Sequence, residues 1–194
     1  MLTAIKYNLA HLTDFKGRDA RQTFWLYVLF LVIAQFAISM AISIPLTGAM
    51  MGDAFVATKQ GASATDIEAR MVGHLGTMMK ASMWLSVVLS LISSALMAAA
   101  FTRRLHDSGK TGWIALATFA IQLIALVLVF TSIEDAVQMV VLTQSGDMSA
   151  VQALQKKFAV QSLLGWVPTA IVVVFGVWPS TKGENRYGPQ PLPV

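Results

Sequence analysis

The sequence predicts an all-α integral membrane protein with four transmembrane helices. Hydrophobic residues make up 56% of the 194 positions and charged residues only 12%, whereas about a quarter of the residues of a soluble domain are charged. The apolar residues are concentrated in four runs, each close to the ~20 residues that a helix needs to cross a bilayer. Basic residues also gather on every second connection between these runs, as in multi-pass membrane proteins.

The predicted spans cover about residues 24–44, 83–101, 113–131 and 160–178. Pro45 predicts an end or a kink after the first span, and Pro168 predicts a kink inside the fourth. The third apolar run continues past Ile133, so we expect its helix to extend toward Leu142 and to stop before Gly146. We treat the whole chain as a single membrane domain.

Two connections, at residues 46–82 and 132–159, are long. Each contains a Ser or Thr followed three residues later by Glu or Gln, at Thr65 and at Ser149. This pattern is typical of a capping box at the start of a helix. We therefore expect helical extensions beyond the bilayer on its outer side.

The amino-terminal segment, residues 1–22, precedes the first span. Its apolar residues Leu2, Ile5, Leu9 and Leu12 recur at helical spacing, which predicts a short amphipathic helix. Such a helix would lie on the membrane surface or pack against the protein itself, and the spacing leaves both alternatives open.

Charge counting predicts that both termini are cytoplasmic. The amino terminus, residues 102–112 and the tail at 179–194 carry nine Lys or Arg and four acids, a net charge of +5. The two long connections carry five Lys or Arg and six acids, a net charge of −1. Because cytoplasmic loops are enriched in Lys and Arg, we expect a multi-pass protein of the bacterial inner (cytoplasmic) membrane.

Three short polar segments carry most of the unusual chemistry. We call them the amino-terminal motif (residues 15–25, FKGRDARQTFW), the central motif (102–113, TRRLHDSGKTGW) and the tail motif (183–191, GENRYGPQP). Each adjoins the cytoplasmic end of a predicted span. The turn-forming residues of the tail motif predict that it folds back and docks rather than staying disordered.

The first hypothesis is that the motifs bind an anionic lipid headgroup or a small phosphate-bearing ligand. An arginine can hold two oxygen atoms of such a group at once, and tryptophan rings favour headgroup depth. The candidate ligand-binding residues are Arg18, Arg21, Trp25, Arg103, Arg104, His106, Asp107, Lys110, Trp113, Asn185 and Tyr187. Basic residues at a cytoplasmic helix end also set topology without binding any specific ligand.

The second hypothesis is structural. Asp107 would pair with Arg18 or Arg21, and Glu184 with an arginine of the central motif, so that the motifs lock the helices together or dock a partner subunit. Both hypotheses use the same residues, and the sequence leaves them open.

The third hypothesis is a passive transporter or channel. No predicted span contains Asp, Glu, Lys, Arg or His, which argues against a proton-coupled pump. A pore would have to be lined by Gln35, Gln122 and the serines at positions 86, 90 and 94. Small residues recurring every four positions are more typical of close helix packing, which is the role we expect for these serines.

Several chemistries are disfavoured. Without cysteine there is no disulfide, no thiolate metal site and no cysteine nucleophile. Gly109-Lys110-Thr111 is not a phosphate-binding loop, because Arg104 stands where that loop needs glycine. We expect no catalytic residue, metal, cofactor or nucleic-acid partner, and an enzyme is the least favoured class. The expected partners are membrane lipids, chiefly anionic ones, and a second copy of the chain or another membrane protein.

In this order, and between apolar spans, the three motifs resemble the bacterial inner-membrane family called domain of unknown function 805. The resemblance covers nearly the whole chain, and the central motif is its most specific part. It implies no activity, and the long outer connections depart from the family's usual compact form. The positions that it marks are Gly17, Arg18, Arg21, Trp25, Arg103, Arg104, His106, Asp107, Gly109, Gly112, Trp113, Gly183, Asn185, Tyr187, Gly188 and Pro189.

Overall fold

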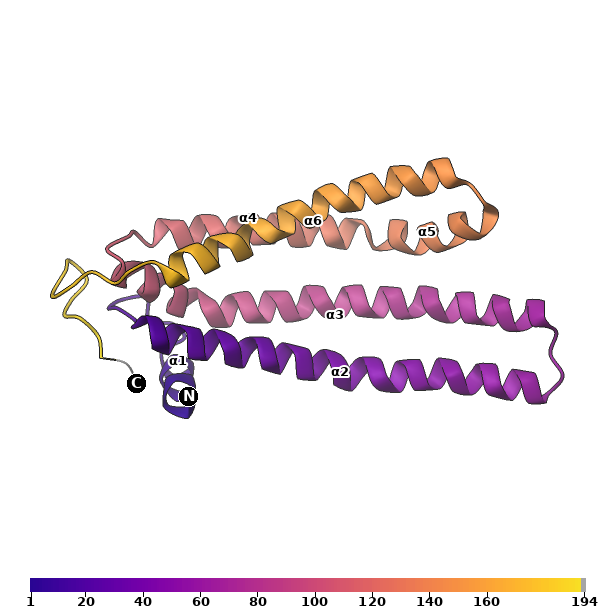
Figure 1. Cartoon of the computed structure of the whole chain (residues 1–194), viewed down its shortest axis with the longest axis horizontal. Helices are drawn as coiled ribbons and strands as arrows, with labels where there is room; N and C mark the ends of the chain where they lie inside the picture. Colours follow the sequence, from indigo (N-terminus) through magenta and orange to yellow (C-terminus); the bar gives the residue numbers. More distant parts are fainter. Residues whose placement is uncertain (193–194) are drawn as a thin grey trace. The chain divides into compact units, whose positions relative to one another are not determined.

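The computed structural model describes residues 1–192, which are helical apart from short connections and the tail (Figure 1). The helices are α1 (Leu2–Ala10), α2 (Arg21–Lys59), α3 (Ala64–Asp107), α4 (Trp113–Thr131), α5 (Ile133–Ser145) and α6 (Met148–Val177). Within these residues there is no strand, and the only β-type pairing is an isolated bridge between Asn185 and Gly188. The predicted all-α class is confirmed.

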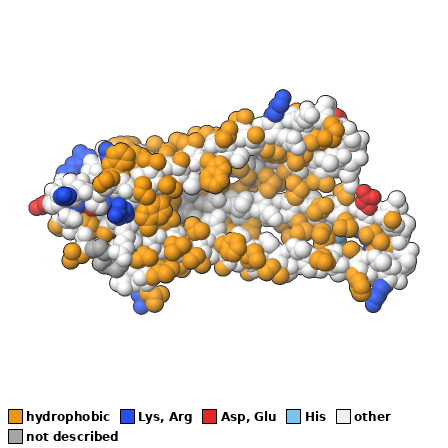
Figure 2. All heavy atoms as spheres, viewed as in Figure 1, with side chains coloured by type: hydrophobic (Ala, Val, Ile, Leu, Met, Phe, Trp, Pro, Cys, Tyr) orange, Lys and Arg blue, Asp and Glu red, His pale blue; other side chains and the backbone are white. Residues whose placement is uncertain are grey.

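Four of the helices, α2, α3, α4 and α6, are long and apolar enough to cross a membrane. Many of their large apolar side chains, such as Phe36 and Leu163, are exposed, and Figure 2 shows hydrophobic side chains over much of the visible face. Such exposure fits helices whose outer surface faces lipid. The chain therefore has the helices of a multi-pass membrane protein, as predicted.

The chain divides into two compact units. Unit 1 consists of Met1–Gln35, Leu89–Leu126 and the described chain from Ser162 onward. Its core is built from α2, α3, α4 and α6, with Phe24, Tyr27 and Phe101 fully buried at its centre. The Tyr27 hydroxyl donates a hydrogen bond to the Leu96 carbonyl at 3.2 Å, which satisfies the one polar group of this apolar cluster. All three motifs belong to unit 1.

Unit 2 consists of Phe36–Val88 and Val127–Gln161. The helix expected to continue past Ile133 is broken there, because α4 ends at Thr131 and α5 begins at Ile133. Ser132 at the break is buried, and its hydroxyl accepts a hydrogen bond from the Gln161 side chain at 2.8 Å. The tertiary contact with Gln161 thus stabilises a break that periodicity did not reveal. The predicted end before Gly146 is confirmed, and Gly146 has the left-handed conformation of a helix C-cap.

Both long connections are helical, but their helices begin earlier than the sequence suggested. The Ser63 hydroxyl caps α3 by accepting the Asp66 backbone N–H at 3.2 Å, and the Asp147 carboxylate caps α6 by accepting the Ala150 N–H at 3.1 Å. The observed caps lie two residues before the predicted ones, Thr65 and Ser149. A residue caps a helix when its side-chain oxygen reaches the unpaired backbone N–H three positions later. Pro45 does not end α2, which continues to Lys59.

Candidate functional site

Arg18 of the amino-terminal motif is buried in unit 1 and contacts the other two motifs. Its Nε and Nη2 both donate to Asp107 Oδ1, at 3.1 and 2.9 Å. Its Nη1 donates to the carbonyls of Gly183 and Gly188 at 2.7 and 3.1 Å, and its Nη2 also donates to the Thr181 carbonyl at 2.6 Å. A guanidinium has five N–H groups. Five hydrogen bonds to four acceptor atoms of the protein therefore use every N–H group of Arg18.

Asp107 lies at the centre of this network and is fully buried. Its Oδ2 accepts hydrogen bonds from Arg104 Nη1 and from the Ser180 hydroxyl, each at 2.5 Å, while Oδ1 faces Arg18. Its backbone carbonyl accepts the Thr181 N–H at 2.8 Å. Asp107 thus joins two buried arginines to Ser180 and Thr181 at the start of the tail.

Arg104 is fully buried as well and turns toward the end of α6. Its Nε donates to the Gly176 carbonyl at 3.0 Å, and its Nη2 donates to the Trp178 carbonyl. Trp25 donates to the same Gly176 carbonyl at 3.1 Å. A Cβ atom at Gly176 would come within 2.8 Å of the Trp25 ring, so glycine permits this close approach. The carbonyls at the end of a helix lack intrahelical partners, and these donors satisfy those of Gly176 and Trp178.

Arg103 points away from Asp107 and holds the amino-terminal segment. Its Nη1 donates to the carbonyls of His11 and Asp14 at 2.8 and 2.5 Å, and its Nη2 donates to Asn8 Oδ1 at 2.7 Å. Its Nε lies 3.0 Å from Asp19 Oδ2, but the two atoms form no hydrogen bond. Burial raises the pKa of Asp19, and the neighbouring Arg103 opposes that shift.

These contacts show how residues 1–22 pack. Helix α1 forms, and its buried face includes Ile5 and Asn8, while Leu2 and Leu9 are exposed. The Arg103 contacts tie the end of α1 to the central motif, so α1 packs against the protein itself.

The tail motif docks, as predicted. The Tyr187 ring stacks on His106 with the ring centres 3.8 Å apart and the planes 7° from parallel. Asn185 donates to the His106 carbonyl at 3.0 Å. His106 Nδ1 lies 3.3 Å from the Gly17 carbonyl. Asn185 and Tyr187 therefore fasten the tail to the central motif.

The remaining predicted site residues lie toward the surface of unit 1. Arg21 and Trp113 are exposed, Trp113 by 75%. Lys110 is half-buried, and its Nζ lies 5.0 Å from the centre of the Trp178 ring. Trp25 is half-buried against α6.

The structural hypothesis is correct for one ion pair and wrong for the other. Arg18 pairs with Asp107 as expected, but Arg103 faces Asp19 and Arg104 also pairs with Asp107. Glu184 is exposed and has no ion pair within residues 1–192. A short side chain beside an arginine on the same helix, such as Asp107, is a nearer partner than a residue of the tail.

Sequence reasoning missed several residues that complete this network. Asn8 and Ser180 contribute side-chain oxygens, and Gly176, Trp178 and Thr181 contribute backbone carbonyls. A carbonyl is present at every position and so leaves no signal in the sequence. Asn8 offered one, because it is a polar residue within the apolar pattern of α1.

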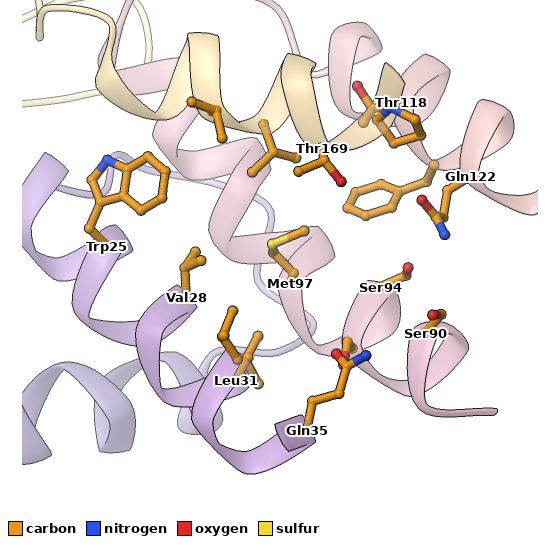
Figure 3. A pocket seen from close by; sticks show the side chains of 16 residues that line it. Trp25, Val28, Leu31, Gln35, Ser90, Ser94, Met97, Thr118, Gln122 and Thr169 are labelled. Atoms are coloured by element: carbon orange, nitrogen blue, oxygen red, sulfur yellow. The ribbon is translucent and has the colours of Figure 1, made fainter. Parts of the chain in front are cut away.

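A second feature of unit 1 is a pocket of about 420 Å³. Figure 3 shows it between side chains that come from α2, α3, α4 and α6. Its polar lining residues are Gln35, Ser90, Ser93, Ser94, Thr118, Gln122 and Thr169, and its apolar ones include Trp25, Met97 and Phe119. No Asp, Glu, Lys, Arg or His lines this pocket. Among residues 1–192 there is also no group of three His, Asp or Glu side chains placed to hold a metal ion.

Comparison with known proteins gives one match. The family described as protein of unknown function (DUF805) matches residues 12–189. No curated protein and no solved structure matches the chain. The matched range includes all but the first eleven and the last five residues, and it contains the amino-terminal motif, the central motif and the tail motif up to Pro189. The chain therefore belongs to the DUF805 family.

Proposed function

We propose that the three motifs form a structural lock and that the protein is a structural membrane subunit, able to present its locked end to a partner. The single observation that carries this proposal is the environment of Arg18. Its five N–H donors are occupied by Asp107 and by three carbonyls of the tail. A guanidinium in this state has no donor left for a phosphate or carboxylate ligand.

The burial of the charged groups supports the same proposed function. Arg18, Arg104 and Asp107 are buried, and a buried charge is tolerated only where it is paired and hydrogen-bonded. Such a network contributes little net free energy to folding. However, it makes every other arrangement of the tail unfavourable, because moving the tail would leave buried donors without acceptors.

Binding of an anionic lipid headgroup or a phosphate-bearing ligand is the second candidate function. It is favoured by the cations that stay exposed in unit 1, among them Arg21, Lys182 and Arg186. Each could attract anionic lipid with about 1 kcal/mol near a membrane surface. Arg18, Arg103 and Arg104 would contribute to such a site by shaping it. Because basic residues collect beside the motifs, we place this end and both termini on the cytoplasmic side of a bacterial inner membrane.

A matched pair of variants separates the two functions. Arg18→Gln and Arg21→Gln each remove one cation from the amino-terminal motif, but only Arg18 is buried and hydrogen-bonded to the tail. We would measure trypsin cleavage after Lys182 and Arg186, and the ratio of phosphatidylglycerol to phosphatidylethanolamine that co-purifies with the protein.

The lock predicts that Arg18→Gln speeds cleavage of the tail at least about tenfold, which corresponds to a loss of about 1.4 kcal/mol of docking energy. Arg21→Gln should leave cleavage unchanged. Equal cleavage of both variants and the wild type, with phosphatidylglycerol lost from Arg21→Gln, would refute the lock and support the binding site.

A further inference from the structure

The pocket of unit 1 has polar side chains at membrane depth that the protein itself does not satisfy. Gln35, Ser93, Gln122 and Thr169 each lie near the middle of a predicted span. Ser93 donates to Gln35 Oε1 at 3.2 Å, and Thr118 donates to the Ile114 carbonyl at 2.7 Å. In a bilayer, water is absent at this depth, so polar groups must find partners within the protein or a ligand.

Four polar side chains of the lining have no such partner. Within residues 1–192, no hydrogen bond is made by the side chains of Ser90, Ser94, Gln122 and Thr169. Other hydroxyls of the same helix, such as those of Thr77, Ser86 and Thr102, donate to a backbone carbonyl three or four residues earlier. A polar group left unpaired in an apolar environment costs about 1–3 kcal/mol. Ser90 and Ser94 line the pocket (Figure 3).

The lining also restricts the charge of an occupant. No ionisable side chain lines the pocket, so a charged group would lose its hydration without gaining a counter-charge. The amide of Gln122 and the two serine hydroxyls offer both donors and acceptors. They match a hydroxyl or amide group on the occupant.

The remaining walls are apolar. Trp25, Met97 and Phe119 line the pocket together with valines and a leucine of α2 and α6, which suits a hydrocarbon chain. The volume of about 420 Å³ is at the lower end of the range for small-molecule sites, about 300–1,000 Å³. This size favours an occupant with a single chain over a lipid with two.

We propose that this pocket binds an uncharged single-chain amphiphile, with a hydroxyl or amide headgroup held by Gln122, Ser90 and Ser94. This inference goes beyond the structural lock: Gln122, Ser90 and Ser94 lie outside the three motifs, and Trp25 is the only motif residue that lines the pocket. Loss of the lock and loss of this site are therefore distinguishable by experiment.

The test uses a monoacylglycerol brominated on its acyl chain, added to the full-length protein in phosphatidylethanolamine nanodiscs. Bromine quenches tryptophan fluorescence on contact, and Trp25 lines the pocket. The expected result is saturable quenching that disappears in Trp25→Phe. Gln122→Leu should raise the half-saturating concentration about tenfold, because it removes one or two hydrogen bonds.

A matched pair on α3 controls for folding and for non-specific partitioning. Ser94→Phe places a large side chain in the pocket. Ser86→Phe is the control, because Ser86 is on the same helix but outside the pocket. Saturable quenching should be lost in the first variant and kept in the second. Quenching that does not saturate, that is equal in both variants, or that a brominated fatty acid anion produces as effectively would overturn the proposal.

Discussion

At the scale of single residues, the molecule uses its arginines as interior donors. Arg18 and Arg104 share the carboxylate of Asp107, while Arg103 holds carbonyls of the amino-terminal segment. Arginine suits this task because its planar, permanently charged group can reach several acceptors at once. A lysine in the same place would offer three donors from a single atom and could not span the same acceptors.

Asp107 should therefore be the residue whose loss costs the most stability. Replacing it with asparagine keeps the shape but leaves two buried guanidinium groups without a counter-charge, which costs about 3–5 kcal/mol. The free energy of unfolding in detergent micelles, measured by denaturant titration, should fall by that amount. Glu184→Gln is the control, because Glu184 is an exposed acid with no ion pair in the described chain. Equal stability of the two variants would show that the carboxylate is dispensable.

At the scale of elements, local capping decides where the helices begin. The polar side chains before α3 and α6 accept backbone N–H groups that would otherwise be unpaired. Sequence periodicity located both helices but placed their starts two residues late. Several Ser, Thr and Asp residues cluster near each start, and only the backbone geometry shows which oxygen is in reach.

The cap of α6 should depend on pH. Hydrogen bonds from the Ala150 backbone and the Ser149 side chain lower the pKa of Asp147 below its ordinary value of 3.8. A carboxyl whose pKa is lowered by folding stabilises the folded state above the unfolded value, and this contribution is lost as pH falls through the lowered value. Hydrogen-exchange protection of the Ala150 amide should therefore be constant above about pH 5 and should decrease well below 3.8.

Asp147→Asn is the matched control for this cap. Asparagine keeps an oxygen acceptor at the helix start but does not titrate. Its protection should be independent of pH over the same range. If the wild-type protein also shows no change in protection, the carboxylate does not cap α6 in solution.

At the scale of the whole molecule, the four apolar helices make a prediction about topology. Four crossings would put the amino terminus and the tail on the same side, and from the excess of basic residues we predict that this side is cytoplasmic. The chain has no cysteine, so single cysteines can be introduced without a background of native thiols.

An impermeant maleimide should therefore label intact bacterial cells at Lys59→Cys and Lys156→Cys only. Lys16→Cys and Glu184→Cys should react after lysis, since all four positions are exposed in the structure. Labelling of Glu184→Cys in intact cells would show that the orientation is the opposite of the predicted one. Labelling of only one of the two positions near the termini would contradict the even number of crossings.

The sequence alone determined the class of this protein and the identity of its important segments. Apolar runs of about twenty residues, empty of charge, predict helices that cross a membrane because the bilayer constrains length and polarity locally. The same local signals identified the three motifs and their order.

Only the tertiary structure decided which residues meet. The contacts of Arg18 with Asp107 and the tail join positions that are 89 to 170 residues apart in the sequence. The pocket forms only if four helices are rotated so that Gln122 and the serines face the same space. Sequence periodicity gives the spacing of residues on one helix but not how that helix is turned toward its neighbours. The contacts that support the proposed lock, and the existence of the pocket, therefore depended on packing between distant segments.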